Sequence, residues 1–145
     1  MINAIPAYSS ASLNVRGFHN YGRGQGARMR AKRANASALA LKHDITSFQE
    51  TNFNFREKRF FGAFLPKELF TYYSNLSKTT AGVATIISPT VCALYHHKEI
   101  PLPENLRGYA ICIAFDAKDG SHSFVALTST SALTALLLVP SSSLR

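Results

Sequence analysis

One stretch decides the fold prediction: His43-Asp44-Ile45-Thr46-Ser47-Phe48-Gln49-Glu50-Thr51. It has the length and apolar content of a short strand, and it ends in a carboxylate where the apolar run stops. Alternation along a strand would project Glu50 from the same side as Phe48. A carboxylate at a strand end, rather than on a solvated helix face, is a candidate metal ligand.

The composition sets the outer limits of the prediction. A chain of 145 residues can bury one hydrophobic core, so we expect one globular unit. Sixteen Lys and Arg against eight Asp and Glu give a net charge of +8 and a pI near 9.8. That balance favours association with a polyanion, nucleic acid or an anionic membrane surface, and on charge alone a protein that is merely basic is an equal alternative.

The positive charge is concentrated before Asp44, the first acidic residue. An acid-free, arginine-rich start imitates an organellar transit peptide, but the segment has no continuous amphipathic period. The run 28–33 can be interpreted as a nuclear address or as a solvated basic helix start, within an intracellular protein. The basic residues of this segment are Arg16, Arg23, Arg28, Arg30, Lys32, Arg33 and Lys42.

Local patterns predict the other elements around this stretch. Residues 31–42 are rich in Ala and Leu and predict a helix. An Asp119-Gly120 pair between two apolar runs predicts a hairpin, and Pro89 ends a buried strand. The phenylalanines between 53 and 70 are expected to pack as core or lid rather than stack on bases. The predicted strands are residues 12–18, 45–50, 70–74, 82–88, 91–95, 109–115 and 123–128.

The two ends of the chain lack these patterns. Residues 1–11 are predicted to be an unstructured start, and residues 131–145 an unrelated tail with no charge before Arg145. Cys92 and Cys112 lie in separate apolar runs without metal-ligand spacing, which is typical of reduced core cysteines in an intracellular protein. No window is long and apolar enough for a membrane span, so no membrane partner is predicted.

Four stretches carry a resemblance to a known family. They are Leu13-Asn14-Val15-Arg16-Gly17-Phe18, then Asp44-Ile45-Thr46-Ser47-Phe48-Gln49-Glu50-Thr51, then Ala81-Gly82-Val83-Ala84-Thr85-Ile86-Ile87-Ser88, and the hairpin at 108–128. In this order they resemble the endonuclease/exonuclease/phosphatase superfamily, the DNase I-like proteins, and above all the endonuclease domain of LINE-type retrotransposons. The resemblance covers residues 12–130, and the Gln-Glu-Thr element is its most specific part.

The resemblance implies an α/β fold, a four-layer sandwich of two mixed β-sheets flanked by helices. Residues 12–130 would be its amino-terminal part, about one sheet plus the first helix. It implies hydrolysis of phosphodiesters in nucleic acid, DNA above all, with Mg²⁺ or Mn²⁺ as cofactor. Glu50 would bind the metal, and Asn14 would orient the metal or the scissile phosphate.

Physical chemistry agrees with these roles and also permits a simpler reading. Mg²⁺ keeps several waters and takes one or two protein carboxylates plus phosphate oxygens, which suits Glu50 beside the amide of Asn14. Arg16 could neutralise phosphate, as could Arg28, Arg30, Lys32 and Arg33. In the simpler reading, Glu50 is a strand-end acid paired with a nearby Arg, and Asn14 is a turn former.

The departures from the family bear on activity. In family members, the last strand of the hairpin continues into an Asn-x-Tyr-x-Pro segment. At the corresponding place this chain has Leu127-Thr128-Ser129-Thr130-Ser131-Ala132. The Asp-x-Asn and Asp-His pairs that activate water have no counterparts here. His96 and His97 are expected to be surface residues of a loop, pointing in opposite directions, so no residue replaces the missing base.

Three functions remain open on the sequence. The first is the amino-terminal half of a metal-dependent nuclease domain, weakly active or inactive, which leaves enzymatic activity undecided. The second is a non-catalytic basic nucleic-acid-binding protein, which would contact phosphates through Arg16, Arg23, Arg28, Arg30, Lys32 and Arg33. The third is an unstable fragment whose apolar strands lack their cover.

Overall fold

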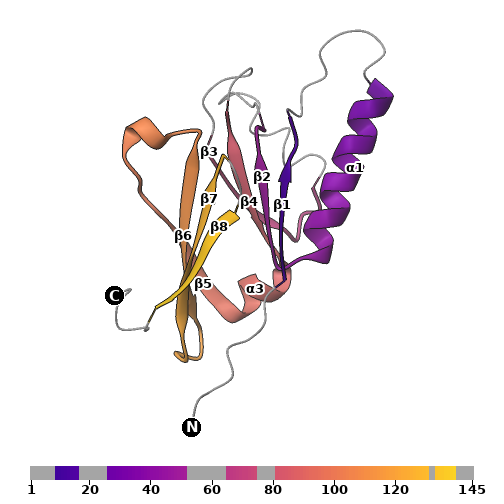
Figure 1. Ribbon diagram of the computed structural model, residues 1–145. Helices are drawn as coiled ribbons and strands as arrows, with labels where there is room; N and C mark the ends of the chain where they lie inside the picture. Colours follow the sequence, from indigo (N-terminus) through magenta and orange to yellow (C-terminus); the bar gives the residue numbers. More distant parts are fainter. Residues whose placement is uncertain (1–8, 17–25, 52–64, 75–80, 131–132, 140–145) are drawn as a thin grey trace.

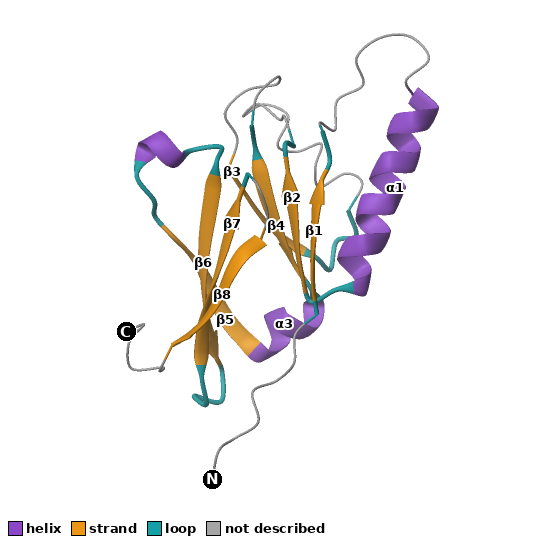
Figure 2. Cartoon of the chain, viewed as in Figure 1, coloured by secondary structure: helices purple, strands orange, loops and turns teal. Residues whose placement is uncertain are grey.

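The computed structural model describes residues 9–16, 26–51, 65–74, 81–130 and 133–139. It is an α/β structure in which two four-stranded sheets pack face to face and a long helix covers one of them (Figures 1 and 2). The coarse α/β class is therefore confirmed. The expectation of about one sheet is wrong, because residues 95–139 form a second sheet.

The first sheet has the order β1-β2-β4-β3 and is mixed. Its strands are β1 (Ser10–Asn14), β2 (Ile45–Gln49), β3 (Phe70–Ser74) and β4 (Val83–Ile87). β1 is parallel to β2, whereas β4 is antiparallel to both β2 and β3. Every residue of β2 and β4 is buried, as expected of central strands that are covered on both faces.

Helix α1 (Gly26–Lys42) connects β1 to β2 and covers one face of the first sheet (Figure 1). Ala36 and Ala40 of the helix are fully buried in a cluster with Phe48 of β2 and Ile86 of β4. Small alanines allow the helix to lie close to the sheet, which explains why an otherwise polar helix docks there. The helix starts five residues before the predicted position, at Gly26 instead of residue 31.

The predicted strand at residues 91–95 is wrong, because a short helix, α3 (Pro89–Leu94), occupies this region. The side chain of Ser88 caps this helix by accepting a hydrogen bond from the backbone N–H of Val91 at 3.2 Å. Proline occupies the first position of α3, where its missing N–H costs nothing. The Ser-Pro signal therefore both ends β4 and begins a helix.

The second sheet is antiparallel throughout, in the order β5-β6-β7-β8. Its strands are β5 (Tyr95–Ile100), β6 (Ala110–Ala117), β7 (Ser123–Ser129) and β8 (Leu133–Val139), and the short 3-10 helix η2 (Glu104–Leu106) lies between β5 and β6. The predicted hairpin is confirmed as β6 and β7. Gly120 adopts the left-handed φ of 76° in its turn.

Two expectations differ from the structure in this sheet. His96 and His97 lie in β5 rather than in a loop. Residues 133–139, predicted to belong to an unrelated tail, form β8 and pair with β7, so this part of the chain is built into the sheet. The predicted start at 1–11 lies largely outside the described residues, although β1 already begins at Ser10. The phenylalanines at 53–64 also lie outside them.

The two sheets enclose the main core. It contains large side chains from both sheets, including Ile87 of β4, Ile113 and Phe115 of β6 and Phe124 of β7. Three buried hydroxyls cross the same interface: Thr128 Oγ1 lies 2.7 Å from Ser47 Oγ and 2.8 Å from Thr85 Oγ1. The described chain thus has three layers, α1, the first sheet and the second sheet.

Candidate metal- and nucleic-acid-binding site

One end of the first sheet gathers the residues that the sequence singled out. β1 and β2 are parallel and finish there, and antiparallel β4 begins there. The backbone N–H of Val15 donates to the carbonyl of Gln49 at 3.0 Å, and that of Thr51 donates to the carbonyl of Gly82 at 3.1 Å. We call Asn14, Arg16, Glu50, Thr51 and Ala81 at this edge the strand-end site.

Three non-glycine residues of the strand-end site have left-handed backbone. Arg16 has a φ of 51°, Glu50 a φ of 54° and Ala81 a φ of 61°. Each such residue costs about 1–2 kcal/mol relative to ordinary backbone. Strained backbone of this kind concentrates at binding and active sites, because the surrounding structure must hold it in place.

The predicted orientation of the Glu50 side chain rests on strand alternation, and the strand ends at Gln49, before Glu50. Within β2 the alternation holds: Ser47 reaches Thr128 of the second sheet, whereas Phe48 packs with α1 on the opposite face. At Glu50 the strand has ended, so the extended rule that grouped Glu50 with Phe48 no longer applies. Glu50 is half-buried at the edge of the sheet.

Asn14 and Arg16 are exposed on either side of buried Val15. The side-chain oxygen of Asn14 accepts a hydrogen bond from the backbone N–H of Arg16 at 3.0 Å, which closes a local turn. The turn-forming role of Asn14 is therefore present. It also leaves the amide exposed at the strand end, next to the strand that leads to Glu50.

Thr51 has a buried hydroxyl for which the sequence analysis predicted no role. Its side chain is fully buried, and its hydroxyl has no hydrogen-bond partner within the described residues. A buried hydroxyl without a partner is unfavourable by about 1–3 kcal/mol. An orphaned polar atom directly after Glu50 adds a second kind of strain to the strand-end site.

Four of the five basic residues of α1 lie in the half of the helix nearest the strand-end site. The chain leaves β1 at the strand-end site and enters α1 at Gly26, so the amino-terminal half of the helix is the half nearest this end (Figure 1). Arg28 and Arg30 are exposed there, while Lys32 and Arg33 are half-buried. The first turn has no acidic residue, so these cations add to the positive end of the helix dipole.

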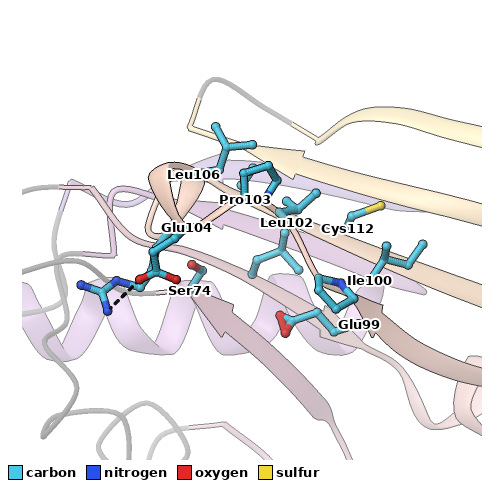
Figure 3. Close-up of a pocket in the computed structure, with 12 residues that line it drawn as sticks. Ser74, Glu99, Ile100, Leu102, Pro103, Glu104, Leu106 and Cys112 are labelled. Carbon is cyan, nitrogen blue, oxygen red and sulfur yellow. Dashed lines mark ion pairs between the residues drawn. The ribbon is translucent and has the colours of Figure 1, made fainter.

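A pocket of about 190 Å³ lies beside the strand-end site, between the end of β3 and the loop around η2 (Figure 3). Ser74 Oγ at its wall accepts from the N–H of Gly108 at 2.7 Å, and the carbonyl of Gly108 accepts from the N–H of Gly82 at 2.8 Å. The exposed pair Glu104–Arg107, 3.3 Å apart, stands at the pocket (Figure 3). Nothing in the local sequence pattern indicated this pocket, because its walls come from separate segments.

The histidines and aspartates of the described residues lie away from this edge. His43 and Asp44 precede the start of β2, at the opposite end of the strand. Asp116 and Asp119 lie in or beside the β6–β7 turn, where Asp119 accepts from the N–H of Ser121 at 2.9 Å. Hydrogen bonds from the hydroxyl of Ser121 and then from its backbone N–H lower the pKa of Asp119 below its usual value. The turn role predicted for Asp119 agrees with these contacts. Asp116 lies in β6 and accepts a hydrogen bond from the hydroxyl of Ser123 at 2.6 Å.

The prediction that His96 and His97 are both surface residues is wrong for His97. His96 is exposed, but His97 is half-buried, with Nδ1 2.7 Å from the Tyr72 hydroxyl. The register pairs His97 with Phe115, an inward-facing residue, so the pleat turns His97 toward the first sheet. Arg23, predicted to bind nucleic acid in the second function, lies outside the described residues.

No protein-family model matches the chain, and no curated protein matches it. Within the described residues, no group of three or more His, Cys, Asp or Glu side chains is arranged to hold a metal ion. In the same part of the chain, no helix is long and apolar enough to cross a membrane.

Proposed function

We propose that residues 12–130 are the amino-terminal half of an endonuclease/exonuclease/phosphatase domain, whose strand-end site binds the phosphodiester backbone of DNA with Mg²⁺ or Mn²⁺. The observation that carries the proposal is the gathering of Asn14, Arg16 and Glu50 at adjoining strand ends, with left-handed backbone at two of them. The DNase I-like fold belongs to this proposal. Two facing sheets with a helix outside the mixed one support it.

The donor set fits a hard divalent cation that keeps most of its waters. Glu50 offers a carboxylate and Asn14 an amide, and Mg²⁺ accepts one or two carboxylates when phosphate oxygens and water fill the other positions. When bound, the ion would neutralise charge on a phosphate. Arg16, exposed beyond Asn14, would pair with a neighbouring phosphate oxygen.

Hydrolysis by this chain is expected to be weak or absent. In-line attack on phosphorus needs a proton acceptor held near the attacking water. Among the described residues, each His and Asp lies away from the strand-end site. They lie at the opposite end of β2, in β5, or in and beside the β6–β7 turn. The site therefore holds a phosphate without a group to deprotonate water.

The test compares Glu50→Gln with Glu68→Gln, in which the same change is made in an exposed residue before β3, far from the strand-end site. We expect Mg²⁺ to tighten binding of a 20-base-pair DNA duplex at least threefold in the wild type and in Glu68→Gln, and to have no effect in Glu50→Gln. Equal Mg²⁺ dependence in all three proteins would overturn the metal-site proposal. Nicking of plasmid DNA that Glu50→Gln abolishes would overturn the expectation of inactivity.

A second candidate is a basic nucleic-acid-binding protein without a metal. The cationic amino-terminal half of α1 favours it, because charges that oppose the helix dipole stabilise the fold poorly and suit a polyanion well. Arg30→Ala should reduce the slope of log K against log salt by about one, and Lys42→Ala at the other end of α1 should not. Binding that is independent of salt in the wild type would exclude this function.

A further inference from the structure

Helix α1 carries apolar side chains on two opposite faces. One face packs on the first sheet through the buried Ala36 and Ala40. The other face points away from both sheets, and no described element lies beyond it (Figure 1). We call the apolar residues of this second face the outer stripe. They are Ala27, Ala31, Ala34, Ala38 and Leu41, and all five are exposed.

The spacing of the outer stripe is that of a seam between two packed helices. Its members follow one another at intervals of four, three, four and three residues. At about 100° per residue, the five side chains therefore lie within about 80° of one another around the helix axis. The high helix propensity of alanine does not explain this pattern, because within residues 27–42 every exposed residue off the stripe is polar.

A shallow groove of about 570 Å³ follows the carboxy-terminal part of the outer stripe. Leu41 at its end is 57% exposed, more than any other large apolar side chain among the described residues. The small side chains along the groove allow a second helix to approach to about 8 Å between axes, the short end of the usual range. The residues that line the groove are Arg30, Arg33, Ala34, Ser37, Ala38 and Leu41.

Cations flank the outer stripe on both sides. Arg30 lies on one side of it, Arg28 and Lys42 lie on the other, and all three are exposed. The whole helix contains basic residues and no acidic one. A helix that laid its own apolar seam on the stripe would place its flanking side chains against these cations. Carboxylates at those flanking positions would pair with them.

The same features disfavour other occupants of the outer stripe. A second copy of α1 would bring two sets of basic residues together without an acid between them. A membrane surface takes up large apolar side chains such as Phe, Trp and Leu, whereas four of the five stripe residues are alanine. Nucleic acid would contact the cations, but its phosphates gain nothing from an apolar seam between them.

We propose that the outer stripe of α1 docks an amphipathic helix of a partner protein, with Leu along its seam and Asp or Glu on both flanks. The docked helix covers the exposed Leu41 and pairs its carboxylates with Arg28, Arg30 and Lys42. DNA bound to Arg28 and Arg30 would compete with it. The strand-end site takes no part, so this proposal and the metal-site proposal can fail separately.

The probe is a fluorescein-labelled synthetic peptide of three heptads, with Leu at the two seam positions of each heptad and Glu at the flanking positions. A control peptide carries Lys in place of each Glu. Fluorescence anisotropy should show that the wild-type protein binds the Glu peptide at least tenfold more tightly than the Lys peptide.

Two variants separate the seam from general charge. Ala34→Gln places a longer, uncharged side chain in the middle of the outer stripe and should weaken binding of the Glu peptide at least fivefold. Asn35→Gln is the matched control, because it places the same side chain at the next exposed position, off the stripe, and should change binding less than twofold. Both positions are on the surface, and thermal melts would verify that both variants fold.

Failure of the wild type to bind the Glu peptide, equal affinity for the two peptides, or equal effects of the two variants would each overturn the proposal. Three further assays compare Ala34→Gln with the wild type: self-association by sedimentation, binding to vesicles of phosphatidylserine and phosphatidylcholine, and binding to a 20-base-pair DNA duplex. A loss in any one of them that Asn35→Gln does not share would assign the outer stripe to a second copy, a membrane or nucleic acid instead.

Discussion

The left-handed backbone at Glu50 leads to a prediction in which stability and function change in opposite directions. Replacing Glu50 by glycine removes the side chain that disfavours a φ of 54°. Ala81→Gly removes the same strain at a φ of 61° without removing a charge. Arg107→Gly is the control, since Arg107 is an exposed residue with an ordinary φ of −58°.

The magnitude follows from two opposing terms. Left-handed backbone costs a non-glycine residue about 1–2 kcal/mol, and glycine costs about 0.5–1 kcal/mol through the greater freedom of the unfolded chain. The difference raises the free energy of unfolding by about 0.7 kcal/mol for Glu50→Gly and for Ala81→Gly. For a chain of this length that corresponds to a rise in Tm of about 2 °C. Arg107→Gly should lower the free energy of unfolding by about 0.5–1 kcal/mol.

Urea unfolding and thermal melts measure these changes, and DNA binding with and without Mg²⁺ measures the functional consequence. We expect Glu50→Gly to be more stable and to lose the Mg²⁺ effect, while Ala81→Gly is more stable and keeps it. A loss of stability in both glycine variants would refute the strain argument. A gain of stability at Glu50 with an unchanged Mg²⁺ effect would refute its role in the strand-end site alone.

Three further predictions concern the fold. Thr128→Val should lower the free energy of unfolding by about 2–4 kcal/mol, because it leaves the buried hydroxyls of Ser47 and Thr85 without their partner. Replacing all three residues by apolar ones should lower it by less than about 1 kcal/mol. Equal losses in the two variants would contradict this account. Burial lowers the pKa of His97 below 6.5 in the folded protein. Its contribution to stability is therefore complete above pH 6.5 and is lost as the pH falls through the pKa of the folded state. Between pH 7 and pH 5, the free energy of unfolding measured in urea should fall less for His97→Gln than for the wild type. Removing residues 131–145 should lower the free energy of unfolding by at least about 2 kcal/mol, because β7 loses its partner β8, and an unchanged melt would favour the tail interpretation.

Sequence patterns succeeded where local rules and burial agree. β2 and β4 are rich in β-branched and aromatic residues, and both are central strands covered on two faces. The β6–β7 hairpin has its Gly120 at the one turn position with left-handed backbone. In these segments the residues that favour the local structure are also those that fill the core.

The patterns failed where neighbours decide the structure. β5 contains two histidines, a lysine and a glutamate, and it is a strand because β6 pairs with it. β8 resembles no alternating strand, yet it completes the sheet beside β7. At residues 89–94, a cap by Ser88 and a proline at the first helical position favour a helix over the strand predicted at 91–95.

The sequence by itself determined the central strands, the hairpin, the basic helix and the candidates Asn14 and Glu50, because these depend on local propensity and on residue chemistry. Only the tertiary structure decided that Arg16, Glu50 and Ala81 share one strained edge, since that depends on parallel pairing of β1 with β2 and antiparallel pairing of β4. The same holds for the contact between Tyr72 and His97, which lie in different sheets. Contacts between residues far apart in the chain depend on how the sheets pair and pack, and no local pattern encodes that arrangement.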